Sequence, residues 1–408
     1  MAVVITGLGT TNPLGATVAT TWEAALAGRS GVRTLDNDWG ERYELPVTFA
    51  GQLVVRPEEV LTRPEMKRMD PSAQYAIIAA REAWADAGSP EVDPVRLGSV
   101  VSSGIGGVWT LLSAWDTVKE RGASRVLPLT VPMLMPNSPT AYVSLEFTAR
   151  AGAHAPVSAC ASGSEAIGLA FEMIESGRAD VVLAGGTEAA IHPLPLAAFA
   201  AMQALSKRNA DPAAASRPYD TGRDGFVMGE GAGVLVLESE EHAKARGARI
   251  YAYLSGVGLA SDANHIASPS ADGQMRAMRA ALERAGVATT DVVHVNAHAT
   301  STPAGDMVEA QGIRDVLGAA ADTAVVSATK SMTGHLLGGA GALESVFTVL
   351  ALNNRVAPPT INVTDPEPGL QIDLVRDVPR ELPSGQVAAI NNAFGFGGHD
   401  VALVFTSA

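Results

Sequence analysis

The chain is almost free of cysteine: its 408 residues contain only Cys160. A single cysteine cannot form a disulfide within the chain, which fits a reducing compartment and makes a cytoplasmic location the expectation. Any chemistry that needs a thiol therefore rests on this one residue.

Long hydrophobic runs and a surplus of positive charge are also missing. No stretch approaches the roughly 18–20 apolar residues that cross a bilayer, so no membrane span is expected. Residues 1–7 lack the basic region and cleavage site of a signal peptide and are expected to form a β-strand. The net charge of −14 argues against general nucleic-acid binding, and an acidic partner would need a locally basic patch.

Short apolar runs alternate with amphipathic stretches along the whole chain, which is typical of an α/β protein. Its 47% hydrophobic residues are ordinary for a globular enzyme, and its 41 glycines indicate close backbone packing. The expected strands cover residues 2–6, 99–102, 181–184, 233–238, 292–296, 324–328, 387–390 and 401–405. The expected helices include residues 73–87, 165–175 and 274–285. A charged stretch at 241–249 divides the chain into expected halves of residues 1–245 and 246–408.

Cys160 follows small and turn-forming residues and precedes a stretch in which Ile167, Ala170 and Ile174 recur at helical spacing. The thiol is therefore expected near a helix N-terminus, where backbone N–H groups stabilise a thiolate. A thiolate is a good nucleophile for acyl transfer. The alternative interpretation is a small buried hydrophobic residue.

Two histidines, His298 and His335, lie in glycine- or threonine-rich segments that follow expected strands. With the thiol they supply what a carbon–carbon condensation needs: a nucleophile that holds an acyl group and two imidazoles that stabilise an enolate or relay protons. Lys330 and Glu344 flank His335 in the sequence. As a buried pair they would orient the imidazoles, whereas as surface charges they would have no such role.

Residues 391–399 read Asn-Asn-Ala-Phe-Gly-Phe-Gly-Gly-His. The glycines around Phe396 would let its backbone N–H point into a cavity, as an oxyanion donor beside the N–H of Cys160, while its ring covers the entrance. A glycine-rich packing corner is the alternative. Residues 6–9 (Thr-Gly-Leu-Gly) begin like a dinucleotide fingerprint, but Asn12 replaces the third glycine, so no nicotinamide or flavin site is expected.

Four motifs, in this order and spacing, carry a family resemblance: residues 157–163, 295–302, 330–335 and 394–398. With them the chain closely resembles, over essentially its whole length, the β-ketoacyl-[acyl carrier protein] synthases of the thiolase superfamily. The KAS I/II branch, and its actinobacterial KAS II members in particular, are the most similar. The resemblance implies a thiolase-like five-layered α/β/α/β/α sandwich of two similar halves, normally a homodimer, with a heterodimer as the alternative.

The resemblance also implies residue roles. Cys160 would carry the acyl group, His298 and His335 would act on the malonyl thioester, and Lys330 and Glu344 would support them. Ile105 would line the acyl pocket, and Thr300 and Thr302 would line the phosphopantetheine channel. Phe394 and Phe396 would also contact the substrate, and Phe396 would be the gate between channel and pocket.

The implied partner is an acyl carrier protein, acyl- or malonyl-loaded, which brings the phosphopantetheine, so no separate cofactor is required. No metal is expected apart from a monovalent cation, which some relatives hold near the residues that match Asn296, Ala297, Glu344, Asn391 and Asn392.

The chain departs from the family pattern in two regions. Ala393 and Asp400 replace a usual serine and asparagine beside the gate. Gln203 and Pro64 stand where some relatives have basic residues that grip the carrier protein. Basic residues near these two positions are expected to form the docking patch instead: Arg63, Lys67, Arg68, Lys207 and Arg208.

Other enzyme classes fit less well. A degradative thiolase normally needs a second cysteine, the KAS III and chalcone synthase branch has asparagine in place of the second histidine, and no Gly-x-Ser-x-Gly motif of a serine hydrolase occurs. A non-catalytic chain-length factor lacks the nucleophile. The predicted function is two-carbon elongation of fatty acids. The alternative is the catalytic ketosynthase subunit of a type II polyketide synthase, which shares every catalytic residue and pairs with a chain-length-factor-like partner.

Overall fold

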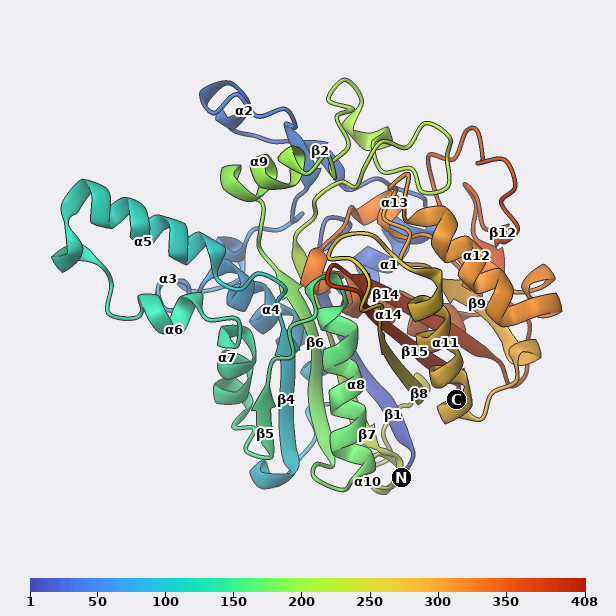
Figure 1. The fold of residues 1–408 in the computed structure, drawn as a ribbon. Coiled ribbons are helices and arrows are strands. Elements are labelled where there is room, and N and C mark those ends of the chain that lie inside the picture. The colour runs from blue at the N-terminus through green and yellow to red at the C-terminus, as the bar shows by residue number, and fades with distance from the viewer.

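The computed structural model describes residues 1–408. Its main feature is one eleven-stranded mixed sheet that runs through the molecule (Figure 1). From one edge to the other its strands are β12 (Asp373–Leu374), β10 (Val325–Ser327), β9 (Val292–Asn296), β14 (Ala388–Gly395), β15 (His399–Ser407), β8 (Ala252–Ser261), β1 (Val3–Thr11), β7 (Gly231–Ser239), β6 (Val181–Glu188), β4 (Leu97–Ser102) and β5 (Gly152–His154).

The two halves of this sheet have the same topology. In chain order the N-terminal half contributes β1, β4, β5, β6 and β7, and the C-terminal half contributes β8, β9, β10, β14 and β15. In each half the third strand is followed across the sheet by the second, fourth, fifth and first. The fifth strand of each half runs antiparallel to both of its neighbours, and β1 and β8 pair antiparallel where the halves meet. The expectation of two similar halves is confirmed.

Helices lie between the halves and outside them. The central helices α8 (Ser162–Glu175) and α14 (Ala340–Asn354) pack against each other and against strands of both halves. On the outside, α4 (Pro71–Asp86) and α7 (Ser138–Phe147) cover the N-terminal strands. The C-terminal strands are covered by α11 (Ala271–Ala285), with α12 (Asp306–Leu317) packed on α11. These layers make the predicted α/β/α/β/α sandwich.

Central helix α14 was not among the expected helices, and its burial explains why. Thirteen of its fifteen residues are buried, so the helix has no polar face and shows no amphipathic period. Its polar residues are satisfied locally: the hydroxyls of Ser345 and Thr348 donate to the carbonyl oxygens of Gly341 and Glu344, one turn earlier. A helix enclosed on all sides has the same sequence pattern as a buried strand.

The expected strands and helices are all present, most of them longer than predicted. Strand β8 was missed because it alternates glycine with apolar residues, and β5 and β12 were missed because they are very short. The predicted division at 245/246 falls between α10 (Glu240–Ala245) and β8. Because the halves share one sheet, it stays a prediction as a domain boundary.

The remaining elements surround the end of the sheet at which β9 and β14 finish, or lie along its edges. The helices are α1 (Val18–Leu26), α2 (Trp39–Arg42), α3 (Arg63–Met66), α5 (Val108–Arg121), α6 (Thr130–Leu134), α9 (Pro193–Ala201) and α13 (Lys330–Thr333). The strands are β2 (Val32–Thr34) paired with β3 (Phe49–Gly51), and β11 (Val356–Ala357) paired with β13 (Arg380–Glu381). No helix is both long enough and apolar enough to span a membrane.

Paired glycines let the outer helices lie directly on the first strand of each half. A Cβ on Gly7 or Gly9 of β1 would collide with carbonyl oxygens of α4. A Cβ on Gly256 or Gly258 of β8 would collide with carbonyl oxygens of α11 in the same way. Gly7 and Gly9 therefore serve helix packing.

We predict that Gly258→Ala lowers the free energy of unfolding by roughly 1–3 kcal/mol, because the added methyl must push α11 away from β8. Gly312→Ala is the matched control: it lies inside α12, and the nearest atoms to its added methyl are 3.6 Å away. That change should raise stability by about 0.5–1 kcal/mol through helix propensity. Urea unfolding monitored by circular dichroism measures both. Equal effects of the two substitutions would contradict the close-packing argument.

Candidate active site

Three segments from both halves of the chain meet at one cavity of about 380 Å³. Cys160 lies in the short helical turn Ala159–Ala161 that leads into α8, as predicted. His298 follows the end of β9, and His335 follows α13. All three side chains are buried and line the cavity. The fold thus unites the residues that the motifs pointed to.

The thiol of Cys160 is protonated at rest. Burial raises its pKa to about 12, while Lys330 and the backbone N–H groups of Phe396 and Cys160 act in the lowering direction. The expectation of a resting thiolate is therefore wrong, because loss of hydration outweighs the favourable position before α8. An acyl transfer at this thiol needs a base nearby.

His298 and His335 are placed to serve as such bases. Their rings meet edge to face with centroids 5.3 Å apart, and His335 also packs against Phe226 and His298 against Phe394. Burial lowers the pKa of both imidazoles well below the usual range, and the positive charge of Lys330 lowers them further. Both rings are therefore neutral near pH 7, and each can either accept or donate a proton.

Lys330 and Glu344 form a buried ion pair, so they are not the surface charges of the alternative interpretation. Burial raises the pKa of Glu344 to about 7, and the Lys330 ammonium opposes that shift. No hydrogen bond links Lys330 to either imidazole; its influence on them is its charge. This differs from the expected role in orienting the rings.

Two backbone N–H groups act on the thiol. Those of Phe396 and of Cys160 itself work to lower the pKa of the sulfur, against the effect of burial. The approach of the two segments depends on Gly395, because a Cβ there would collide with the carbonyl oxygen of Ser158. This arrangement suits an oxyanion hole, with fixed donors beside the atom predicted to carry the acyl group.

Left-handed backbone conformations occur at non-glycine residues beside all three reactive side chains. They are Ala159 (φ 51°), Ser301 (φ 70°) and Leu337 (φ 49°). Such conformations are unfavourable for residues with a Cβ and persist where the surrounding structure enforces them. The sequence has no signal for this strain, since glycine would be the usual choice.

The predicted substrate-binding residues also line the cavity. Ile105 is 40% exposed, Phe394 is buried, and Phe396 is 37% exposed, with both of its neighbours glycine. The hydroxyls of Thr300 and Thr302 lie 3.2 Å apart along the loop after His298. Their roles in binding stay predictions, but their positions match them.

Two buried carboxylates at the cavity were not predicted. Glu309 of α12 accepts hydrogen bonds from the backbone N–H groups of His298 and Ala299, eleven and ten residues earlier, at 2.8 and 2.7 Å. Glu188, at the end of β6, accepts from Ser103 and from the N–H groups of Gly104, Ile105 and Gly338. Burial raises the pKa of both, that of Glu188 to about 7. The one sequence signal for these carboxylates is the position of Glu188 at the end of a strand.

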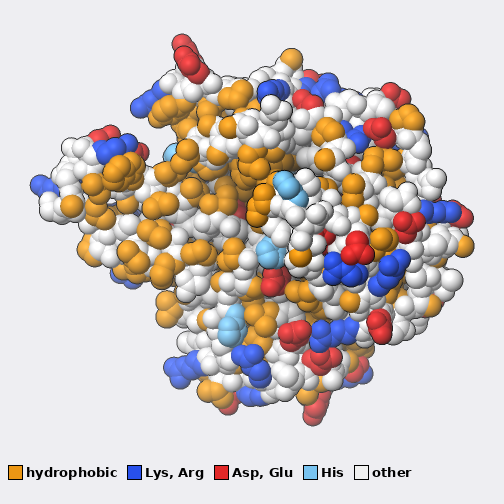
Figure 2. Space-filling view, viewed as in Figure 1, with side chains coloured by type: hydrophobic (Ala, Val, Ile, Leu, Met, Phe, Trp, Pro, Cys, Tyr) orange, Lys and Arg blue, Asp and Glu red, His pale blue; other side chains and the backbone are white.

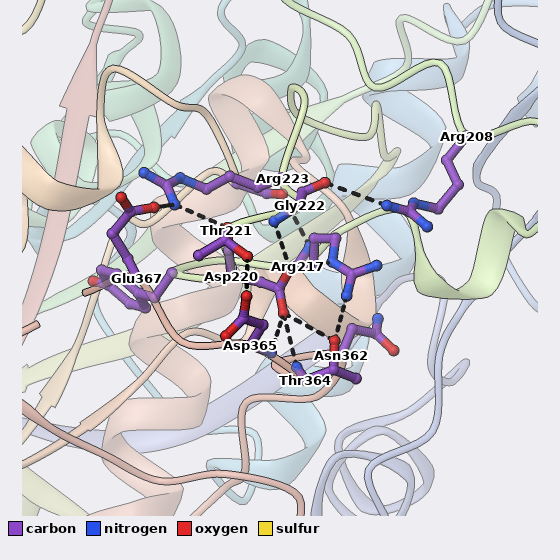
Figure 3. A network of polar contacts seen from close by, with 12 residues as sticks. Arg208, Arg217, Asp220, Thr221, Gly222, Arg223, Asn362, Thr364, Asp365 and Glu367 are labelled. Carbon is purple, nitrogen blue, oxygen red and sulfur yellow. Dashed lines mark hydrogen bonds and ion pairs between the residues drawn. The ribbon is translucent and has the colours of Figure 1, made fainter.

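A polar network supports the loop after His298 (Figure 3). Asp220 accepts hydrogen bonds from Arg217 and from the backbone of Gly222, Thr364 and Asp365. Although burial acts to raise the pKa of Asp220, these donors hold it below its usual range.

From the same network, the guanidinium of Arg223 donates to the carbonyl oxygens of Thr302 and Pro303. Residues 217–226 therefore form a salt-bridged turn that also shapes the site.

The residues predicted near a monovalent cation include three buried oxygens without a hydrogen-bond partner: Oε2 of Glu344 and the Oδ1 atoms of Asn391 and Asn392. Carboxylate and amide oxygens are the donors that hard cations prefer. Asn296 donates to the Glu344 carbonyl and accepts from Thr329, while the N–H of Ala297 donates to Ser327. The donor set thus fits a hard cation.

The predicted docking residues fall into two groups. Arg63, Lys67 and Arg68 are exposed around α3, whose neighbours are α4 and the turn before it, and none of them lines the cavity. Lys207 is exposed and Arg208 half-buried a few residues after Gln203 and Ala204, which do line it. Arg208 donates to the carbonyl oxygen of Gly222 (Figure 3). Only this second group adjoins the cavity rim.

Comparisons with known proteins agree with the geometry. Residues 1–243 match the family model for the "Beta-ketoacyl synthase, N-terminal domain" and residues 251–364 that for the C-terminal domain. A protein of Mycobacterium tuberculosis named 3-oxoacyl-[acyl-carrier-protein] synthase 2 is 45% identical over 406 residues, 99% of this chain and 96% of that protein.

Solved structures are also similar. A ketosynthase in complex with its type II PKS acyl-carrier protein matches with a TM-score of 0.93 and 32% identity, over 100% of this chain and 99% of that one. A β-ketoacyl synthase from Burkholderia phymatum STM815 matches with a TM-score of 0.91 and 37% identity over the same shares.

We predict that alkylation of Cys160 by iodoacetamide accelerates about tenfold per pH unit from pH 7 to pH 9, because the thiolate fraction grows by that factor below a pKa of about 12. Intact-protein mass spectrometry follows the reaction without ambiguity, since the chain has no other cysteine. Cys160→Ala provides the blank. A rate that levels off below pH 9 would mean that the resting site holds a thiolate after all.

Proposed function

The chain belongs to the β-ketoacyl synthase family, and we propose that it carries out the family's decarboxylative condensation with Cys160 as the acyl carrier. It is an acyltransferase of the 3-oxoacyl-[acyl-carrier-protein] synthase type that serves fatty-acid elongation, like the mycobacterial relatives. The observation that carries the residue assignment is the meeting of one buried thiol, two neutral imidazoles and two inward N–H groups in a single cavity.

In the first step the thiol of Cys160 attacks the carbonyl of an acyl thioester. A neutral imidazole takes the thiol proton, the new C–S bond forms, and the carrier thiol leaves with a proton. The N–H groups of Phe396 and Cys160 stabilise the negative oxygen of the tetrahedral intermediate. The low basicity of both imidazoles favours prompt return of the proton to the leaving thiolate.

In the second step the malonyl thioester loses CO₂, and the electrons of the broken bond form an enolate. His298 and His335 donate hydrogen bonds to the enolate oxygen, which neutral imidazoles can do without a change of charge. The enolate carbon attacks the acyl carbonyl on Cys160, the C–S bond breaks, and the released thiolate takes up one proton from water, because its first proton left with the carrier thiol. The product is a 3-oxoacyl thioester longer by two carbons.

An acyl carrier protein is the proposed partner, and its phosphopantetheine arm is the only prosthetic group the reaction uses. The loop with Thr300 and Thr302 offers two hydroxyls along the way from the rim to Cys160. Because the enzyme carries a net charge of −14, encounter with an acidic carrier depends on local positive charge. A monovalent cation at Glu344, Asn391 and Asn392 is a further proposal; it would offset the charge of their unpartnered oxygens.

A second copy of this chain is the proposed cover for an apolar surface on the N-terminal half. Only Val108 of the α5 residues is buried, and Leu111, Trp115, Leu127 and Val131 are more than half exposed. Hydrophobic side chains gather over α5 and α6 in Figure 2. Edge strand β5 nearby pairs only with β4, so its other side can accept a strand. A homodimer would cover both.

The alternative is the catalytic ketosynthase of a type II polyketide synthase. One specific observation favours it: the ketosynthase in complex with its type II PKS acyl-carrier protein superimposes with a TM-score of 0.93. The mycobacterial sequences are more similar, at 45% against 32% identity. Mass spectrometry of the acyl groups trapped on Cys160, after a ladder of acyl-carrier thioesters is offered to this chain alone, separates the two. Loading of saturated fatty chains without any partner chain supports elongation.

We predict that Cys160→Ala abolishes acyl transfer and condensation with the fold retained. His298→Ala and His335→Ala should each reduce malonyl decarboxylation by roughly 10²–10³-fold, because an enolate donor is lost. Acyl loading of Cys160 should fall much less, because the remaining imidazole can still accept the thiol proton. Half-reactions measured separately with radiolabelled thioesters show the difference.

His294→Ala is the control for these variants, since His294 is buried in β9 against Ser327 and does not line the cavity. It should lower stability without favouring one half-reaction. Equal losses in both half-reactions for His298 and His335, with unfolding, would mark them as structural.

We predict that Lys67→Glu with Arg68→Glu, and separately Lys207→Glu with Arg208→Glu, raise the KM for acyl carrier protein severalfold and weaken its salt dependence. Turnover of a small pantetheine thioester should barely change. Arg29→Glu is the control, because Arg29 is exposed and lines no part of the cavity. If only the 207–208 pair has an effect, the α3 group is not part of the docking surface; if both substrates suffer alike, neither group is.

A further inference from the structure

Two loops close the mouth of the cavity. One is residues 262–270, between β8 and α11, and the other is residues 396–398, between β14 and β15. Two backbone hydrogen bonds join them: the N–H of Gly397 donates to Ile266 at 2.7 Å, and the N–H of Asp262 donates to Gly398 at 2.9 Å. Any acyl group that enters between these loops must disturb this junction.

Two carboxyl groups lie side by side behind the junction. Asp400 is the second residue of β15 and is only 3% exposed, and Asp262 begins the first loop. Oδ2 of Asp400 and Oδ1 of Asp262 are both buried without a hydrogen-bond donor. A Cβ on Gly273, in the first turn of α11, would collide with both of these oxygens, so they face the same point. Asp400 occupies the position at which asparagine is usual in the family.

The positive charge of Arg276 acts to lower the pKa of Asp400, but burial and Asp262 outweigh it, and no ion pair joins Arg276 to either carboxyl. On α11, Arg276 donates to Asp272 and to the carbonyl oxygen of Ser261, and Asp272 is itself negative. In the first loop, His265 accepts from the N–H groups of Ala267 and Ser268.

The remaining titratable neighbour is His399 on β15, which is exposed. Asp262 is half-buried, and its Oδ2 accepts from the N–H of Ser270, which leaves Oδ1 as the oxygen without a donor. Two negative charges this close would repel strongly, and a proton between them removes the conflict.

We propose that Asp262 and Asp400 share one proton when the mouth is closed, and that this proton fastens the loop 262–270 to the loop 396–398. The two aspartates are then positioning residues for the mouth of the cavity, a role beyond the condensation chemistry. The inference rests on the proposed function only for its kinetic readout, because closure of the loops can be measured without any substrate.

The direction of the pH effect follows from the two states. In the closed site, burial and the charge of Asp262 raise the pKa of Asp400 to about 8. With the loops apart, the Asp400 carboxyl faces water and ionises near pH 4. Between about pH 4 and pH 8 the closed state therefore binds one more proton, and each unit of pH shifts the equilibrium about tenfold toward opening. Above pH 8 the shift ends, because both states are ionised.

Hydrogen exchange of the backbone amides tests this in the intact protein. The protection of residues 262–270 and 396–398, corrected for the intrinsic exchange rate, should fall about tenfold per pH unit from pH 6 to pH 8 and then level off. Asp400→Asn should make the protection independent of pH, because its amide donates to Asp262 and does not titrate. Asp262→Asn should do the same. Asp272→Asn, an exposed carboxylate on α11, should keep the wild-type profile.

A kinetic and a spectroscopic measurement complete the test. The KM of a small pantetheine thioester should depend on pH between 6 and 8 in the wild type and not in Asp400→Asn. The ratio of the two KM values at each pH removes the titration of Cys160, which both proteins share. The infrared difference between wild type and Asp400→Asn at pH 7 should contain the carbonyl band of a protonated carboxyl.

Parallel protection profiles of wild type and Asp400→Asn, or no such band, would overturn the proposal. A wild type that shows the exchange profile but never loads acyl groups would refute the proposed function and leave this inference standing.

Discussion

The burial of the reactive side chains where the two halves meet is the constraint on which the chemistry depends. Burial raises the pKa of Cys160 to about 12 and that of Glu344 to about 7, and it lowers the pKa of both imidazoles, those of His298 and His335. The resting site is therefore a set of largely neutral groups near one buried ion pair. Charge that develops during the reaction meets fixed N–H groups and imidazoles, which need no reorganisation, instead of mobile water.

The duplicated fold is what makes such an enclosed site available. Each half alone has one face of its strands open, and the pairing of β1 with β8 brings these faces around α8 and α14. The nucleophile arrives on the N-terminal end of one central helix and the second histidine just before the other. Because both helices are enclosed, the residues at their ends are held against both halves at once, and the site exists only where the halves meet.

The enclosed site also contains strained backbone and buried carboxylates. Left-handed residues stand beside all three reactive side chains, and buried carboxylates hold the segments that carry them: Glu309 the backbone of His298, and Glu188 the turns at Ile105 and Gly338. A rigid frame of this kind keeps the reactive groups in one geometry. The mouth is different, because only two backbone hydrogen bonds and a pair of carboxyls close it.

The sequence alone determined which residues come together at the cavity and the order of the strands and helices that carry them, because Cys160, His298 and His335 sit in short motifs and apolar runs reveal strands. Only the tertiary structure decided the state of those residues. Helix α14 was hidden by its complete burial, and the thiol proved to be protonated because desolvation outweighs the helix end. Asp262 and Asp400 are far apart in the chain, and their contact follows from the pairing of β8 with β15. Burial and proximity of distant residues set these properties, and neither is a local feature of a sequence.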